Sequence, residues 1–276
     1  MATSSTASAP KPTVIAPDPE AHRPSLAYRI FSVWYRHVRV YSKNLISNGL
    51  PPFLEPLIFL VGIGLGLGRY IDSMEGLPYL NYLASGLLVT AAMFTAAFEC
   101  TFGTFIRLEF DKVYDGMLAS PITANDLLIG EILWAGTKGF VFSASVLVIV
   151  SSFGILPLGP TLIAPVLGFL TGVMFASVGL LVTSFVTTIN HFNFFFTGFL
   201  SPMFFFSGVV FPVDQLPTVI RPIAEALPLT HSVRLTRAFA FGEFGLINLW
   251  DVGYILVFMA VVGFLAVTRL RKRLID

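Results

Sequence analysis

Four ionisable side chains fall in or beside long apolar stretches of the sequence, where a charge is costly. They are Glu55, Glu99, Glu131 and Lys138. An ionisable group inside an apolar, membrane-crossing helix marks a transport path or pairs with an opposite charge. Glu131 and Lys138 are about two helical turns apart and share one helix face. We expect structural pairing more than substrate contact at all four positions.

The sequence lacks the motifs of nucleotide-binding and hydrolytic enzymes. It has no G-x-x-x-x-G-K-[ST] phosphate-binding loop, and the glycines of 62–68 do not follow the G-x-G-x-x-G order. No serine stands in a nucleophile elbow. The four histidines lack metal-ligand spacing: His22, His37, His191 and His231. We therefore expect no catalytic residue, no metal site and no cofactor in this chain.

The composition restricts the class of protein that can position these groups. Of the 276 residues, 55% are hydrophobic and 12% are charged, against about 25% charged in soluble domains. The net charge of +1 argues against a nucleic-acid partner. A single cysteine cannot form a disulfide within the chain. An all-α integral membrane protein is the class that remains.

Apolar segments of bilayer length follow one another along the chain. No Asp, Glu, Lys or Arg occurs between Lys138 and Asp214, and turn residues divide that stretch into three spans. Small residues in 62–68 favour close helix packing near the end of the first span. The sequence predicts six transmembrane helices, at about 47–68, 79–105, 126–153, 161–187, 192–211 and 250–269.

The distribution of basic residues predicts the orientation. With both termini in the cytoplasm, most of the 17 Lys and Arg residues lie inside, as the positive-inside rule requires. Residues 1–24 are rich in Ala, Ser, Thr and Pro and are expected to form a disordered tail. The prediction is a multi-pass membrane protein with N-in, C-in topology.

Residues 25–46 have helical periodicity before the first span. With Ser32, four basic residues recur there at spacings of three and four and form one basic face: Arg29, Arg36, Arg39 and Lys43. The segment is expected to be an amphipathic helix at the cytoplasmic surface. Its basic face either anchors the helix to anionic lipid or also meets a soluble partner.

The loop 106–125 is the most charged segment between spans. Its charged residues and one tyrosine are the candidates for a functional role: Arg107, Glu109, Asp111, Lys112, Tyr114 and Asp115. A short helix ending near Ser120 is expected before Pro121, and Thr123 or Asn125 can cap the next helix. This loop is either a solvated connector or a docking element with a mixed polar and apolar surface.

The external region 212–249 is punctuated by prolines and is too long for a simple connector. Two short helices are expected, at 214–226 and 229–241, and the first has an apolar side that can dip back into the membrane. Upstream, the aromatic residues of 192–206 either pack the helices or line a path. The candidates for a path are Phe194, Phe195 and Phe205.

These features together resemble the ABC-2 permease family. The carrying motifs are F-S-G-V-V-F-P-V-D-Q-L-P at 206–217, L-P-L-T-H-S at 227–232 and Arg237. Phe98-Glu99 and G-E-I-L-W-A-G-T-K at 130–138 are similar to the nodulation protein J subfamily, permeases for lipo-chitooligosaccharide export. The resemblance covers about residues 25–273 and predicts an ABC-2 exporter fold.

The resemblance implies a transport subunit without an ATPase site. Such permeases form a homodimer and bind two separate ATP-binding cassette subunits, which carry ATP and Mg²⁺. The 106–125 loop would be the coupling element at the ATPase, and the 25–46 helix its flanking interface helix. The external helices would close the outer end of the path, with gate residues Pro212, Asp214, Pro217, Arg221, Pro228 and Arg237.

The substrate and the energy source leave alternatives open. A glycolipid or lipid-linked oligosaccharide, moved outward across the bacterial inner membrane, is the leading expectation. Hydrophobic drugs or antibiotics are a second substrate class within the same family. An ion-coupled secondary transporter working through Glu99 or Glu131 and Lys138 is a third possibility.

Overall fold

The computed structural model describes residues 24–43, 54 and 58–275. The predicted tail 1–24, the first half of the predicted first span and Glu55 therefore lie outside the described residues, apart from Pro24 and Leu54. The described fold is helical except for a two-stranded hairpin, β1 (Ser73–Met74) and β2 (Leu77–Pro78).

Four helical stretches of the described chain are long and apolar enough to cross a bilayer. The first is α4 (Tyr79–Phe98), which continues through the π-helical segments η2 (Glu99–Gly103) and η3 (Ile106–Phe110). The second is α6 (Ala124–Ser152), and the third joins α7 (Leu158–Thr161) to α8 (Ala164–Thr183). The fourth is α13 (Leu246–Ile275). The prediction of an all-α integral membrane protein is confirmed.

Shorter elements complete the described chain. They are α1 (Leu26–Lys43), η1 (Leu60–Leu65), α5 (Val113–Leu118), η4 (Ile189–His191), α9 (Phe192–Phe195), η5 (Phe196–Leu200), α10 (Ser201–Phe206), η6 (Val213–Gln215), α11 (Arg221–Ala226) and α12 (Pro228–Phe241). The segment η1 corresponds to part of the predicted first span, and α9, η5 and α10 correspond to part of the predicted fifth span. The total of six spans stays a prediction.

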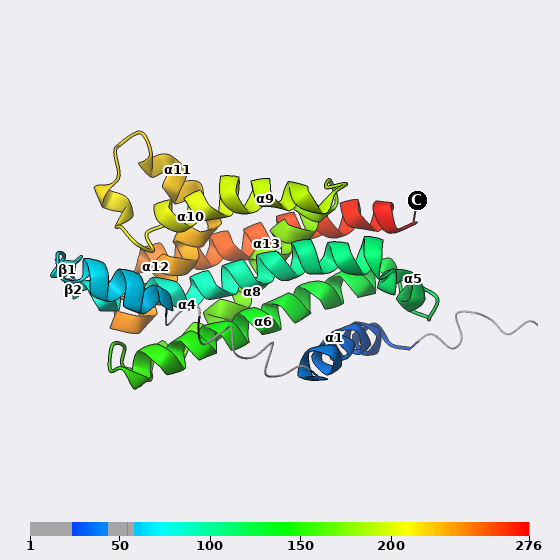
Figure 1. Ribbon diagram of the computed structural model, residues 1–276, viewed down its shortest axis with the longest axis horizontal. Helices are drawn as coiled ribbons and strands as arrows, with labels where there is room; N and C mark the ends of the chain where they lie inside the picture. The colour runs from blue at the N-terminus through cyan, green and yellow to red at the C-terminus, as the bar shows by residue number, and fades with distance from the viewer. Residues whose placement is uncertain (1–23, 44–53, 55–57, 276) are drawn as a thin grey trace, which may run out of the picture.

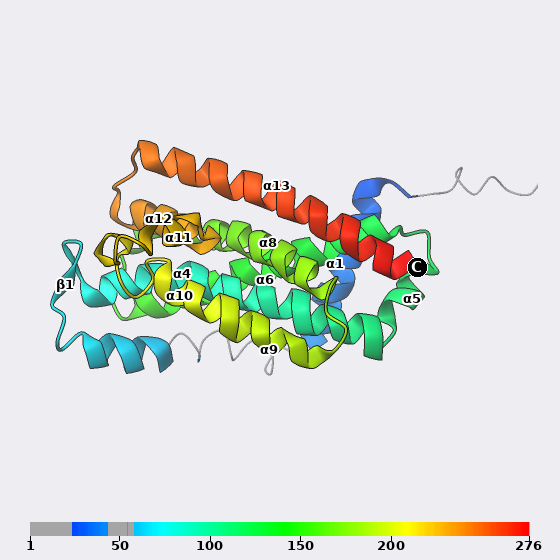
Figure 2. The ribbon, with the colours of Figure 1, turned by 90° about the horizontal axis from the view of Figure 1, so that it is seen from above.

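The long helices run along one common axis and leave two distinct ends (Figure 1). The short helix α5 and the chain's C-terminus lie at one end, which we call the α5 end. The hairpin, α11 and α12 lie at the opposite end, which we call the α12 end. Helix α1 lies across the bundle near the α5 end, and α9 and α10 follow each other along one side (Figure 2).

Helices α6 and α8 approach each other through glycines. A Cβ added to Gly139 would lie 2.6 Å from the carbonyl oxygen of Gly168, and one added to Gly172 would lie 3.0 Å from the Cα of Gly136. Small residues allow this approach because no side chain separates the two backbones. Among the glycines of 62–68, Gly64 lies close to α4, since an added Cβ would meet the Leu80 side chain at 2.7 Å, whereas one added to Gly62 or Gly66 meets no atom of the described residues within 4 Å.

Two element boundaries differ from the sequence-based expectation. The second predicted span ended at residue 105, but its helix continues to Phe110 and takes Arg107 and Glu109 with it. The first predicted external helix, 214–226, is reduced to η6 and α11. The break follows from Pro217, because the residue before a proline avoids helical geometry and Leu216 is extended, with φ −71° and ψ 152°.

Candidate functional site

A cluster of charged side chains joins four elements near the α5 end of the bundle. Glu131 and Lys138 come from α6, and Glu99 and Arg107 come from the continuation of α4. The surrounding elements add His37 of α1 and Tyr114 of α5. Residues distant in the sequence meet here because the end of α4, the start of α6 and α1 pack side by side.

Glu131 is at the centre of this cluster and its side chain is fully buried. One carboxylate oxygen, Oε2, lies 2.7 Å from Nη2 of Arg107. The other, Oε1, accepts a hydrogen bond of 2.8 Å from the Tyr114 hydroxyl and lies 2.9 Å from Nε2 of His37. One carboxylate therefore ties together α1, α4, α5 and α6.

Glu99 is the second carboxylate and connects the two basic residues. Its Oε1 lies 2.8 Å from Nη1 of Arg107, and its Oε2 lies 2.8 Å from Nζ of Lys138. Glu99, and not Glu131, is therefore the acid that contacts Lys138. Glu131 and Lys138 lie on one face of α6, but two turns separate them, and Glu99 and Arg107 fill the interval between their charges.

The cluster is balanced in charge when His37 is neutral. Two carboxylates face one guanidinium and one ammonium, and each pair is within hydrogen-bond distance. Such pairing offsets the several kcal/mol that burying each ion costs. His37, Glu99 and Glu131 place possible metal-ligand atoms within 4.8 Å of one another. However, Arg107 and Lys138 already contact the two carboxylates, so a metal ion would have to displace them.

The predicted coupling residues divide into a buried and an exposed group. Tyr114 is fully buried, and Arg107 is mostly buried in the cluster, so neither presents its side chain at a docking surface. The other four, Glu109, Asp111, Lys112 and Asp115, are half-buried or exposed. Burial, followed by the charge of Glu131, raises the pKa of Tyr114 well above its ordinary value, so its hydroxyl stays a donor.

The start of α6 is fixed by a capping box. Of the two candidate caps, Thr123 forms it: the Thr123 side chain accepts from the Asp126 amide, and the Asp126 carboxylate accepts from the Thr123 amide. Asp126 also lies 2.9 Å from Nε of Arg29 on α1. This ion pair holds the first turn of α1 against the first turn of α6.

Further contacts of α1 are also made with α6. Val33 is fully buried against Gly130, and Trp34 donates a 2.9 Å hydrogen bond from Nε1 to the Thr137 hydroxyl. Of the other predicted interface residues, Arg36 is half-buried and Arg39 and Lys43 are exposed. Among the basic residues of α1, Arg29 therefore binds α6, whereas Arg36 is partly covered and Arg39 and Lys43 are exposed.

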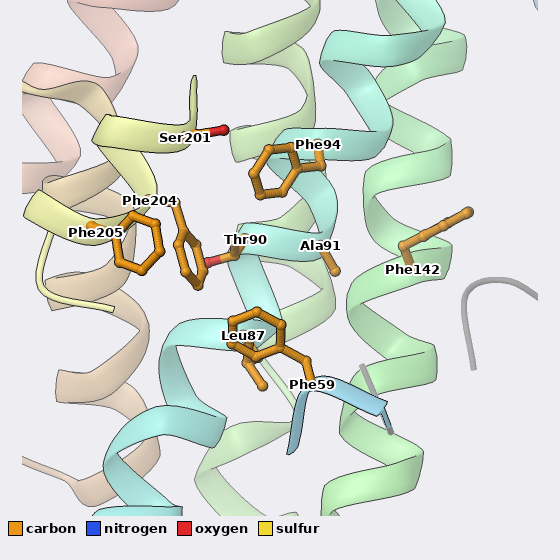
Figure 3. A pocket seen from close by; sticks show the side chains of 9 residues that line it. All are labelled: Phe59, Leu87, Thr90, Ala91, Phe94, Phe142, Ser201, Phe204 and Phe205. Atoms are coloured by element: carbon orange, nitrogen blue, oxygen red, sulfur yellow. The ribbon is translucent and has the colours of Figure 1, made fainter. Parts of the chain in front are cut away.

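An apolar groove lies beside the charged cluster and continues toward the α12 end. The part nearer the α12 end, which we call its outer part, has a volume of about 320 Å³ and is lined by residues of α4, α6 and α10 (Figure 3). The adjoining part, of about 360 Å³, shares Phe94 and Phe142 with the first and reaches Lys138. The groove is thus lined by aromatic rings and ends at a cation of the cluster.

The predicted pathway aromatics occupy three different environments. Phe205 lines the groove, as Figure 3 shows. Phe195 is buried in the hydrophobic core, and Phe194 is exposed away from the groove. The sequence reasoning missed the other aromatic residues of the outer groove: Phe59, Phe94, Phe142 and Phe204.

The predicted gate residues gather at the α12 end. Arg237, a residue of α12, makes two contacts with other segments. Its Nη2 donates to the carbonyl oxygen of Gly208 at 3.0 Å, and its guanidinium carbon lies 3.6 Å from the centre of the Tyr82 ring. Arg221 donates to the backbone of Leu216 and Asp214, which holds the loop before α11. Pro212 and Pro228 are buried, whereas Asp214 and Pro217 are exposed.

A second ionic network at this end was not predicted from the sequence. Arg234 of α12 contacts Glu225 at 2.9 Å and Asp251 of α13 at 2.7 Å. His231 lies 2.7 Å from the same Asp251 carboxylate and stacks on Tyr254. The sequence contains one indication of this network. His231 and Arg234 are three residues apart on one helix, so their side chains share a face, and both contact Asp251 of α13.

Long apolar helices that bury a balanced ionic cluster define a multi-pass α-helical membrane protein. Residues 28–241 match the ABC-2 type transporter family, and the chain belongs to this family. The family's members are transmembrane subunits of transporters and are not enzymes themselves. The resemblance to ABC-2 permeases and to nodulation protein J is thereby confirmed.

Several curated relatives extend over nearly the whole chain. Nodulation protein J of Rhizobium leguminosarum bv. trifolii is 35% identical over 244 residues, which cover 88% of this chain and 93% of the relative. Nodulation protein J of Sinorhizobium fredii is 32% identical and covers 92% and 97% of the two chains. The inner membrane transport permease YadH of Escherichia coli is 20% identical, over 85% of this chain and 89% of the relative.

Proposed function

We propose that this chain is the permease of an ATP-driven exporter that moves a lipid-linked oligosaccharide outward across the bacterial inner membrane. A second copy of the chain completes the pathway, and two separate ATP-binding cassette subunits bind ATP and Mg²⁺. The α5 end faces the cytoplasm and the α12 end faces outward. Membership of the ABC-2 family supports the need for a separate ATPase.

The contact between Tyr114 and Glu131 is the observation that carries this proposal. It anchors the short helix α5, at the end of the molecule, to the buried cluster that also holds α1, α4 and α6. A force applied to the exposed residues of α5 is therefore transmitted to the membrane helices through a direct contact. In two-state terms, ATP must favour the ATPase arrangement that pushes α5 and opens the path outward.

The groove beside the cluster supports a substrate with an apolar chain. Its aromatic lining offers dispersion contacts to an acyl chain, and Lys138 adds a charge at its inner limit. Similarity to nodulation protein J favours a lipo-oligosaccharide as that substrate. Hydrophobic drugs fit the apolar part equally well, so a drug exporter is the alternative within the family.

An ion-coupled secondary transporter is the alternative outside ATP-driven transport. It would use the Glu99 or Glu131 carboxylate to bind the coupling ion. Each of these carboxylates already contacts one or two basic side chains at 2.7–2.9 Å. That pairing supports a structural role for the two acids and disfavours ion coupling.

ATPase stimulation measured on the assembled complex tests the proposal. The permease is purified with a candidate ATPase partner, and hydrolysis is measured after charge reversal at the exposed α5 end (Asp111→Lys with Asp115→Lys). We expect loss of both complex formation and stimulated ATP turnover. Asp72→Lys, an exposed acid near the hairpin at the opposite end, is the matched control and should leave both unchanged. Unchanged ATP turnover in the α5 variant would contradict the coupling role.

A further inference from the structure

A polar cavity lies at the α12 end, separate from the apolar groove. Its volume of about 220 Å³ exceeds the roughly 10–15 Å³ that one water molecule needs by a comparable measure. One face of α12 forms a wall of the cavity, because lining residues recur there at helical spacing. They are Thr230, Val233, Arg234, Arg237 and Ala238.

Four other segments close the cavity around this face of α12. They are the hairpin turn, the segment from the end of α10 into η6, helix α11, and the segment that leads into the first turn of α13. The polar residues that they contribute are Glu75, Ser207, Asp214, Glu225, Glu243 and Asn248. Val213 and Ile247 add apolar surface. The lining thus combines hydrogen-bonding groups with small apolar patches.

The charges of the lining disfavour an anionic ligand. Four carboxylates, those of Glu75, Asp214, Glu225 and Glu243, outnumber the guanidinium groups of Arg234 and Arg237. Both guanidinium groups are also engaged: Arg234 with Glu225 and Asp251, and Arg237 with the Gly208 carbonyl oxygen. A phosphate would find excess negative charge and no free cation among the described lining residues.

A neutral, hydroxyl-rich ligand fits the same lining. Carboxylates accept hydrogen bonds from hydroxyl groups, and a serine hydroxyl such as that of Ser207 can donate or accept one. Val213, Val233 and Ile247 can contact the C–H face of a sugar ring. Ser207 supplies an independent observation, because it lines the cavity and its buried Oγ has no hydrogen-bond partner among the residues that the structure describes. Buried hydroxyls are normally paired.

We propose that this cavity binds one saccharide unit of the exported molecule at the outer end of the pathway. The inference rests on the proposed export function, since it assigns the sugar portion of that substrate to a site of its own. The acyl portion would occupy the groove, and the α12 cavity would select for a hydroxyl-rich headgroup. A drug exporter has no need of such a site.

Binding of a lipid-free oligosaccharide to the full chain in lipid nanodiscs tests the proposal. Chitotetraose is the probe, titrated by saturation-transfer NMR, with inorganic phosphate and CaCl₂ as comparison ligands. Ser207→Ala removes the unpaired hydroxyl and no hydrogen bond within the protein, so we expect the thermal midpoint to be unchanged. Saccharide affinity should fall about three- to tenfold, the effect of one hydrogen bond.

The matched control is Ser232→Ala. Ser232 also buries an Oγ without a partner in the described part of the chain, but it does not line the cavity. Its substitution should change affinity less than twofold. Absence of chitotetraose binding, or equal effects of the two serine variants, would overturn the proposal.

Binding of Ca²⁺ or phosphate in place of chitotetraose would also overturn it. Ca²⁺ binding that Asp214→Asn abolishes would identify a cation site. The ATPase measurement at α5 does not depend on this cavity. Failure of saccharide binding with intact ATPase coupling would therefore reject the saccharide site alone, whereas failure of coupling would reject the proposed function.

Discussion

At the scale of single residues, the α5 end depends on a carboxylate that contacts three other elements. Glu131 is within 2.9 Å of Arg107, Tyr114 and His37, which belong to different segments of the chain. Removal of one member of a buried ionic network leaves its partners with uncompensated charge or unpaired donors. Substitutions at Glu131 are therefore the most informative single changes in this molecule.

Glu131→Gln keeps the shape of the side chain but removes its charge. Arg107 then retains only Glu99 as an ionic partner, and we expect the free energy of unfolding to fall by about 3 kcal/mol or more. Thermal unfolding of the purified protein in detergent measures the change. Glu243→Gln, the same substitution at an exposed position, should shift stability by less than about 0.5 kcal/mol. Equal shifts in the two variants would show that the cluster is not stabilising.

The sequence predicted the costly charges of this cluster but not their partners. Glu99, Glu131 and Lys138 were identifiable because each interrupts an apolar stretch. Arg107 was assigned to a surface loop because the extension of α4 to Phe110 is not visible in hydropathy alone. His37 was missed because its partner is 94 positions away in the sequence, and only the packing of α1 on α6 brings them together. Local spacing carries no information about such pairs.

At the scale of elements, the Tyr114 hydroxyl joins α5 to the charged cluster, while Val113, Met117 and Leu118 pack against the hydrophobic core. Tyr114→Phe deletes the hydroxyl that donates to Glu131, and a buried hydrogen bond to a charged group contributes about 1.5–3 kcal/mol. We expect that loss in unfolding free energy and weaker ATPase stimulation in the assembled complex. Tyr28→Phe, at an exposed position of α1, is the control and should change neither. Normal stimulation in Tyr114→Phe would mean that α5 does not act through Glu131.

The contact between α6 and α8 makes a separate prediction. Gly139→Ala places a methyl group 2.6 Å from a carbonyl oxygen of Gly168, and neither backbone can yield without moving a helix. We expect a loss of about 1–3 kcal/mol, as for other overpacked interiors. Gly253→Ala on α13 is the control, because an added Cβ there meets nothing within 4 Å. The two variants are compared by their thermal midpoints, and equal midpoints would refute tight packing at Gly139.

Element boundaries were predictable where the local chemistry is strong. Thr123 caps α6 and α12 begins at Pro228, as motifs at helix starts indicate. The external helix expected at 214–226 was overextended because its apolar spacing was weighed above Pro217. The small-residue spacing at 62–68 indicated close packing, and Gly64 does lie against Leu80 of α4. The glycine contact between α6 and α8 was not predicted, because it needs small residues on two facing helices, which the pattern of a single helix cannot reveal.

At the scale of the whole molecule, the described chain has a charged end and a polar end joined by apolar helices. The proposed orientation places the α5 end inside, and the single native cysteine, Cys100, is buried. Ala119→Cys and Thr218→Cys introduce exposed thiols at opposite ends. In spheroplasts a membrane-impermeant maleimide should label only Thr218→Cys, and permeabilisation should add labelling of Ala119→Cys. The reverse pattern would contradict the N-in, C-in topology.

The architecture also accounts for the limits of the sequence analysis at this scale. Apolar content and charge placement identified a multi-pass α-helical protein, and motifs identified the ABC-2 family. The groove and the α12 cavity each draw residues from several segments distant in the sequence. Only Phe205 of the three predicted pathway aromatics lines the groove, because hydropathy does not specify which face of a helix turns toward its neighbours.

Transport into or out of proteoliposomes tests the central claim most directly. The permease is reconstituted with and without its ATP-binding cassette partner, and movement of a labelled lipo-oligosaccharide is followed. We predict transport that requires both the partner and ATP, and that is lost in the variant combining Asp111→Lys and Asp115→Lys. Transport by the permease alone, driven by a proton or sodium gradient, would contradict the account.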